Sequence, residues 1–170
     1  MARHLLVVRH GIAESRESFA LLGRNDEHRP LTIDGRRRMK QGVAGLHTMV
    51  SDPGELWSSS LTRAVQTAEL LALEYDRPSH ETDVLRPEAR PEAWLDWFRG
   101  IRSDDVCIVG HDPHLSSLIT WLLAGEFRPA VELKKGGVAM LEFSADGPAA
   151  SRGAVLNWMV TPAQLRTLGS

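Results

Sequence analysis

The chain has 170 residues, of which 42% are hydrophobic and 25% are charged, the usual balance for a soluble globular protein. This length predicts one domain over residues 1–170 with a core of its own. The formal net charge of −2 gives no overall attraction to nucleic acids or anionic membranes, so we expect neither as a partner. A local cationic pocket remains compatible with this charge.

The cysteine count and the N-terminal segment indicate the cellular compartment in which we expect the protein. Cys107 is the single cysteine, which excludes an internal disulfide, and it lies in an apolar run where a buried structural thiol is expected. The first apolar run, residues 5–8, is too short for a signal peptide core or a membrane span. We therefore expect a cytoplasmic protein.

Residues 4–11 carry the first functional signal. An apolar run rich in β-branched residues ends in Arg9, His10 and Gly11, which predicts a buried parallel strand that delivers two polar side chains at its C-terminal end. Ligands bind at that end of the strands in open α/β sheets. Taken alone, the stretch favours a strand that ends in two ordinary surface residues, because Arg-His-Gly is a weak motif.

The following elements are read from hydrophobic spacing. Residues 12–28 predict a short helix or loop, and Asp34 is the expected N-cap of a helix with apolar residues at 39, 43, 46 and 50. Residues 55–58 predict a second strand, and Ser59 or Ser60 is expected to cap the next helix. Arg63 then falls in the first turn of that helix, where the backbone already favours an anion.

In the C-terminal half, predicted strands and helices continue to alternate. Residues 76–92 predict a loop, followed by a helix whose aromatic stripe (Trp94, Trp97, Phe98 and Ile101) is expected to pack in the core. Residues 106–109 predict a third strand that ends at His111, with Asp112 as N-cap and Pro113 as first residue of the next helix. A turn at 134–137, strands at 138–143 and 154–160 joined by a hairpin loop over 145–153, and a short terminal helix complete the chain. Strands that alternate with helices predict an α/β fold, with a mostly parallel sheet covered on both faces.

Three predicted strand ends thus offer Arg9 with His10, Arg63, and His111 at one edge of the sheet. Two arginines and two histidines without a matching acidic cluster form a cationic pocket for a dianion. Metal binding by the histidines is the alternative, but the arginines would repel a cation. A neutral histidine could attack a phosphoryl group while the arginines stabilise its oxygens, and an acid is needed to protonate the leaving group.

Four segments together resemble the histidine phosphatase superfamily, and within it the short SixA-type phosphohistidine phosphatases. They are Leu-Val-Val-Arg-His-Gly at 6–11, Arg-Pro-Leu-Thr-Ile-Asp-Gly at 29–35, Ser-Ser-Ser-Leu-Thr-Arg-Ala-Val-Gln-Thr-Ala at 58–68 and Val-Gly-His-Asp-Pro at 109–113. The resemblance implies a three-layer α/β/α sandwich of the phosphoglycerate mutase type, with His10 as the phosphorylated nucleophile. It also implies a phosphate pocket completed by Arg9, Arg63 and His111, Arg29 as a phosphate or substrate contact, and no metal or cofactor.

The chain departs from the family pattern at two places. Mutase-type members carry a polar residue after Arg-His-Gly that helps to bind phosphate, whereas Ile12 and Ala13 follow here, and then Glu14 and Ser15. The same members place a glutamate acid before the third catalytic strand, and Glu88 is the nearest candidate here, ahead of Glu92 and Asp112. A protonated phosphoramidate leaves more easily than an alkoxide, so a weak acid would suffice for phosphohistidine.

The short connection from Leu85 to Val106 leaves little chain for a lid above the pocket. An open pocket suits a phosphate presented on a protein surface, such as a histidine-containing phosphotransfer domain. The leading hypothesis is therefore a phosphohistidine protein phosphatase. A phosphatase for small phosphomonoesters or nucleotide-related metabolites is the first alternative, and a catalytically silent phosphate-binding protein is the second.

Overall fold

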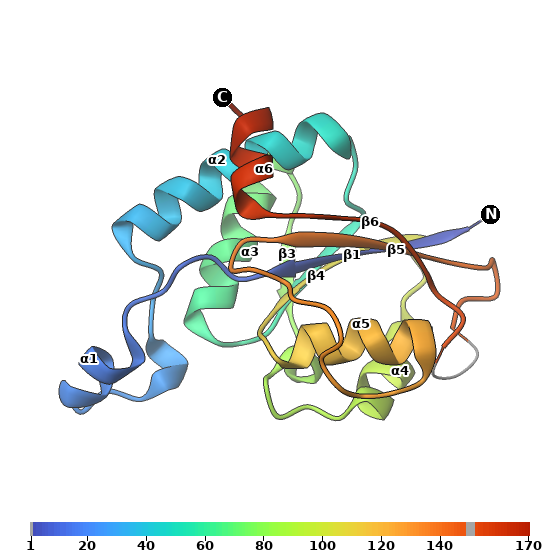
Figure 1. The fold of residues 1–170 in the computed structure, drawn as a ribbon, viewed down its shortest axis with the longest axis horizontal. Helices are drawn as coiled ribbons and strands as arrows, with labels where there is room; N and C mark the ends of the chain where they lie inside the picture. Colours follow the sequence, from blue (N-terminus) through green and yellow to red (C-terminus); the bar gives the residue numbers. More distant parts are fainter. Residues whose placement is uncertain (1, 149–151) are drawn as a thin grey trace.

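The protein is built on a six-stranded sheet in the order β3-β2-β4-β1-β5-β6 (Figure 1). The computed structural model describes residues 2–148 and 152–170. Strands β1, β2, β3 and β4 run parallel, whereas β5 is antiparallel to β1 and β6 is antiparallel to β5. The strands span Arg3–Arg9, Glu55–Ser58, Ser79–Glu81, Asp105–Gly110, Val138–Phe143 and Val155–Val160. The predicted α/β class and mostly parallel sheet are confirmed.

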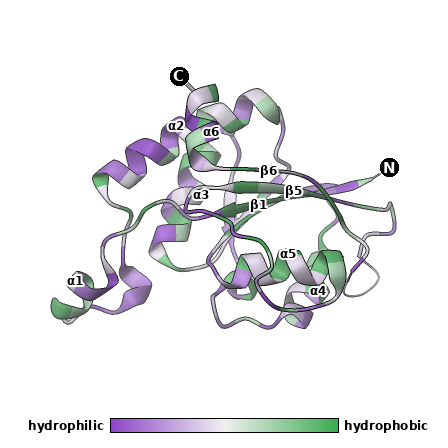
Figure 2. Cartoon of the chain, viewed as in Figure 1, coloured by the Kyte–Doolittle hydropathy of each residue, from purple (hydrophilic) through white to green (hydrophobic). Residues whose placement is uncertain are grey.

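Helices cover both faces of this sheet. On one face lie α2 (Ile33–Met49), α3 (Thr62–Tyr75) and α6 (Pro162–Leu168), and on the other lie α4 (Pro91–Gly100) and α5 (His114–Ala124). Successive side chains of β1 point to opposite faces of the sheet, so the strand contributes to both helical layers. Leu6 and Val8 pack with α2 and α3, whereas Leu5 and Val7 pack with α4 and α5. The central strands are accordingly hydrophobic, whereas the N-terminal half of α2 is hydrophilic (Figure 2).

The aromatic stripe of the helix that was predicted after residues 76–92 packs in the core, as expected. Trp94 and Phe98 of α4 are fully buried, and their rings stack with centroids 4.8 Å apart. Cys107 is also fully buried, in the middle of β4. No helix among the described residues is both long enough and apolar enough to span a bilayer.

Several local predictions were wrong. Residues 76–92 are not all loop, because β3 pairs with β2 and a 3₁₀ turn, η2 (Asp83–Leu85), follows it. The N-cap of α2 is Thr32, whose hydroxyl accepts the Gly35 N–H at 2.8 Å, and Asp34 lies inside the first turn. The last strand begins at Val155 rather than 154. Of the predicted hairpin loop, residues 149–151 lie outside the described residues.

The segment between β1 and α2 is irregular and projects away from the sheet at the left of Figure 1. It contains a short helix, α1 (Arg16–Leu21), and a 3₁₀ turn, η1 (Asp26–His28). The side chain of Ser15 caps α1 by accepting the Ser18 N–H at 3.3 Å. This projecting segment forms one wall of the cleft that is described next.

Candidate active site

The C-terminal ends of three parallel strands bring the two histidines together. Arg9 pairs with Gly110 in the sheet, and the His10 N–H donates to the Gly110 carbonyl at 3.1 Å. The rings of His10 and His111 consequently lie with their centroids 5.2 Å apart. They share a cleft of about 320 Å³ that is lined by Arg9, His10, Ala13, Glu14, Ser15, Arg16, Arg29, Arg63, Pro87, His111, Asp112 and Lys135.

The His10 ring has one defined proton position. Its Nδ1 lies 2.7 Å from the carbonyl oxygen of Gly11, and since a carbonyl only accepts, Nδ1 carries the hydrogen. Nε2 therefore keeps its lone pair. Burial lowers the pKa of His10 to about 3. The hydrogen bond to Gly11 acts in the opposite direction, whereas the positive charges of Arg63, Arg9 and Arg29 lower the pKa further. The ring is neutral at pH 7.

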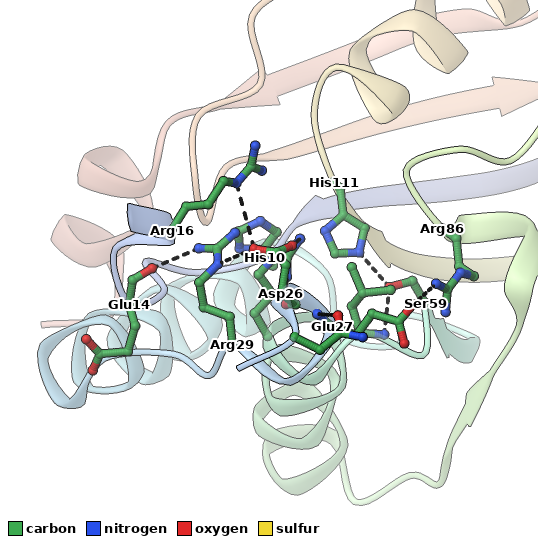
Figure 3. Close-up of polar contacts among 12 residues, drawn as sticks. His10, Glu14, Arg16, Asp26, Glu27, Arg29, Ser59, Arg86 and His111 are labelled. Atoms are coloured by element: carbon green, nitrogen blue, oxygen red, sulfur yellow. Dashed lines mark hydrogen bonds and ion pairs between the residues drawn. The ribbon is translucent and has the colours of Figure 1, made fainter. Parts of the chain in front are cut away.

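His111 is fixed by a serine from the neighbouring strand end. Its Nε2 lies 2.5 Å from the Oγ of Ser59, which also accepts the Leu61 N–H at 3.3 Å (Figure 3). Burial, followed by the nearby His10 and Arg63, lowers the pKa of His111 to about 2. Its Nδ1 is buried without a hydrogen-bond partner among the described residues. Ser59, which the sequence suggested only as a helix cap, is thus a contact of the site.

Arg63 lies in the first turn of α3, as predicted, and its side chain is almost fully buried. Its Nη1 donates to the Asp26 carbonyl at 3.0 Å, and its Nη2 lies 3.3 Å from the Asp26 carboxylate. Arg29 donates from Nε to the same carboxylate at 2.8 Å and from Nη1 to the Glu14 carbonyl at 2.8 Å. Asp26 therefore joins two of the site arginines, and its contact with Arg29 is drawn in Figure 3.

The expectation of a pocket without matching acidic groups was therefore wrong in part. Burial raises the pKa of Asp26, but the hydrogen bond from Arg29 and the charges of Arg63, Arg29 and Arg16 outweigh it and lower the pKa overall. The group is ionised at neutral pH. Sequence reasoning missed it because Asp26 belongs to the irregular segment 12–28, where no periodic pattern indicates which side chain turns inward.

Arg9 completes the cationic wall. Its Nη1 donates to the Leu133 carbonyl at 2.8 Å and lies 3.7 Å from the Asp112 carboxylate. The carboxylate of Asp112 also accepts the N–H and hydroxyl of Ser116 at 3.1 and 2.8 Å, which is the expected capping role, although Pro113 is the N-cap position of α5. The Nε atoms of Arg9 and Arg63 are buried without partners among the described residues.

Glu88 is not among the residues that line the cleft, where its neighbour Pro87 is found. Its side chain is 66% exposed and accepts from Arg86 Nε at 2.6 Å. Arg86 is held further by Ser60 Oγ at 3.0 Å and by an ion pair with Glu27. The hydrogen bond from Arg86 lowers the pKa of Glu88. The structure thus brings His10, His111, Arg9, Arg29 and Arg63 together and leaves Glu88 outside.

This arrangement defines a class of site. A neutral imidazole with a free nitrogen, three guanidinium groups and a second imidazole suit a tetrahedral dianion whose phosphorus can be attacked in line. Among the described residues, no group of three or more His, Cys, Asp and Glu side chains is arranged to hold a metal ion. These residues suit the binding of a phosphoryl group and the stabilisation of its charge during transfer.

Comparisons with known proteins identify the family. The model of the histidine phosphatase superfamily (branch 1) matches residues 5–87. An uncharacterized protein of Picosynechococcus sp. is 31% identical over 145 residues, which cover 83% of this chain and 86% of that protein. The chain belongs to the histidine phosphatase superfamily and is a phosphatase.

Solved structures show the same fold. The protein histidine phosphatase SixA in complex with tungstate matches with a TM-score of 0.75 at 21% identity, covering 95% of this chain and 99% of that one. A protein described as a phosphohistidine phosphatase SixA from Agrobacterium tumefaciens matches with a TM-score of 0.74 at 19% identity, covering 94% and 98%. The chain therefore has the SixA-type fold.

Proposed function

We propose that this phosphatase removes the phosphoryl group from phosphohistidine on a protein, through a covalent phosphohistidine on its own His10. The observation that carries the proposal is the state of the His10 ring. Nδ1 donates to Gly11, Nε2 keeps a lone pair, and the ring is neutral beside three guanidinium groups. These are the requirements for an imidazole nucleophile that attacks a bound phosphate.

Two displacements complete the reaction. In the first, the Nε2 lone pair of His10 forms a bond to phosphorus while the P–N bond of the substrate breaks, and the leaving imidazole nitrogen gains a proton. In the second, water attacks the phosphorus, its P–O bond replaces the bond to His10, and inorganic phosphate leaves. Arg9, Arg29, Arg63 and His111 stabilise the charge on the phosphoryl oxygens in both steps.

Two carboxylates beside the cleft, Asp26 and Glu88, favour a phosphoramidate substrate. Asp26 and Glu88 both have lowered pKa values because arginines contact them, so neither holds a proton for an alkoxide at neutral pH. The nitrogen of a phosphohistidine is more basic than an ester oxygen and can take its proton from water. An open cleft with a short connection above it also accommodates a phosphate carried on a protein surface.

Trapping the covalent intermediate tests the proposal. Brief exposure to a phosphohistidine peptide labelled in its phosphoryl group, followed by denaturation at alkaline pH, should leave label on the wild-type chain and none on the His10→Ala variant. His47→Ala is the control, because that histidine lies on the surface, paired with Glu74 at 3.0 Å. Label that persists in His10→Ala would refute His10 as the nucleophile.

A substrate panel tests the choice of substrate. The wild-type enzyme should hydrolyse a phosphohistidine peptide with a higher kcat/KM than serine phosphate, sugar phosphates or nucleoside monophosphates. A clear preference for one of these small esters would refute the protein substrate while leaving the phosphatase chemistry in place.

A further inference from the structure

Two cations beside the cleft have no role in the chemistry proposed above. Lys135 lines the cleft and also an adjoining small cavity of about 20 Å³, which Arg166 of α6 lines as well. Among the described residues, neither side chain has an ion-pair or hydrogen-bond partner. We call Lys135 and Arg166 together the basic strip.

The position of Lys135 is tied to the nucleophile. The N–H of Gly136 donates to the carbonyls of Arg9 and His10, both at 3.1 Å, and the Arg9 N–H donates to Gly137 at 3.1 Å. The turn that carries Lys135 is thereby fixed to the end of β1. The backbone at Lys135 is therefore held in a fixed place relative to His10.

Other cations of this region differ because carboxylates already contact them. Lys134, the chain neighbour of Lys135, pairs with Glu132 at 2.7 Å and does not line the cleft. Arg38 lines the small cavity but pairs with Asp34 at 2.6 Å. Lys135 and Arg166 therefore remain available for a partner of opposite charge.

Two carboxylates also line the cleft, but neither forms an ion pair with Lys135. Asp112 is held by Arg9 and Ser116, and Glu14 lines the cleft with no ion pair to Lys135. Neither carboxylate is paired with Lys135, which therefore remains available to an acidic group of a substrate.

We propose that the basic strip binds carboxylate side chains of the substrate protein that lie beside its phosphohistidine. The inference rests on the proposed function and adds the chemistry of the partner surface, which must be acidic next to the phosphorylated residue. Lys135 would contact the carboxylate nearest to the phosphoryl group, and Arg166 one farther along. Both contacts lie at the rim, so they would act on KM and association more than on turnover.

Two phosphohistidine peptides of equal length test this proposal. One has aspartate and glutamate on both sides of the phosphohistidine, and the other has asparagine and glutamine at the same positions. At low ionic strength, the wild-type kcat/KM should favour the acidic peptide by about five- to tenfold, the range expected for one or two exposed ion pairs. The preference should shrink as salt is added.

The variants assign the preference to the basic strip. Lys135→Glu should abolish the preference or reverse it, and Arg166→Ala should reduce it about two- to threefold. Lys134→Glu, one position away, should retain the wild-type ratio. Lys135 is exposed, so its variant should fold, and equal thermal unfolding midpoints of the variant and the wild type check this.

The outcomes separate the two proposals. If the wild type hydrolyses both peptides equally well, or if Lys135→Glu keeps the preference for the acidic peptide, the basic strip does not bind substrate and the proposed function stands. If the wild type hydrolyses neither peptide but hydrolyses small phosphate esters, the proposed function is wrong and the inference falls with it.

Discussion

Asp26 contacts two of the three guanidinium groups that would hold a phosphate. Its carboxylate accepts from Arg29 and lies 3.3 Å from Arg63, so an arriving dianion must share or replace those contacts. The same carboxylate offsets part of the mutual repulsion of the arginines, which otherwise meet with little solvent around them. We therefore expect Asp26 to act on phosphate affinity through Arg29 and Arg63.

Replacement of this carboxylate should strengthen phosphate binding. We expect Asp26→Asn to lower the inhibition constant of inorganic phosphate by about three- to tenfold at neutral pH, because a competing negative charge is removed while the side-chain shape is kept. Asp34→Asn is the matched control, since Asp34 also pairs with two arginines but is exposed on α2. Weaker phosphate binding in Asp26→Asn would show instead that the carboxylate mainly orients Arg29 and Arg63.

The difference between the predicted and the missed residues has a physical origin. His10, Arg63 and His111 follow regular strands or open regular helices, so the periodic pattern alone places them at one edge of the sheet. Asp26 and Ser59 reach the site through local turns, and their contacts depend on long-range packing. Glu88 was chosen for its place in the chain, but Arg86 is its contact.

At the level of elements, the N-terminus of α2 supports the loop that follows the catalytic strand. The Thr32 N–H donates to the Ile12 carbonyl at 3.0 Å, and a Cβ added to Gly35 would lie 2.0 Å from that same oxygen. The helix can approach the loop only because residue 35 has no side chain. Gly42, farther along α2, has an ordinary 3.8 Å distance from its would-be Cβ to Leu165.

This contrast gives a matched pair of variants on one helix. Gly42→Ala should raise the free energy of unfolding by about 0.5–1 kcal/mol, because alanine favours the helix and finds room. Gly35→Ala should lower it by about 1–3 kcal/mol and reduce kcat/KM, because the loop that holds His10 must shift. Urea unfolding and phosphohistidine hydrolysis measure both effects. A Gly35→Ala enzyme with full stability and activity would contradict the support of the loop by α2.

Elements were predicted where the hydrophobic pattern is long. The apolar run of β1, the helical spacing of α2 and α3 and the aromatic stripe of α4 were each sufficient to predict the element that carries them. β3 was missed because its three residues, Ser-His-Glu at 79–81, are polar or exposed and form a strand only by pairing with the edge of β2. Such an edge strand carries no apolar alternation for a sequence pattern to detect.

For the molecule as a whole, the buried histidines link stability to pH. His10 and His111 have pKa values of about 3 and about 2 in the folded chain, against about 6.5 in an unfolded chain. Between these values the unfolded chain binds more protons, so stability rises with pH. The stabilisation is fully present above about pH 6.5 and is lost as the pH falls toward the folded values.

Urea unfolding at several pH values checks this. We expect nearly constant stability between pH 8 and 7 and a steady loss between about pH 6.5 and 4.5, before most carboxylates titrate. A His111→Asn variant should lose less stability over the same interval because it lacks one of the buried histidines whose pKa is lowered. Parallel curves for wild type and variant would show that His111 does not contribute to the pH dependence.

The burial of Cys107 sets the redox character of the molecule. The single thiol of the chain is sealed inside the central sheet, and burial raises its pKa, so almost none of the thiolate that oxidants and alkylating agents attack is present. The proposed mechanism, in which the imidazole of His10 attacks phosphorus, needs no reduced sulfur. An enzyme that used it would be independent of the peroxide and glutathione balance that inactivates phosphatases with a cysteine nucleophile.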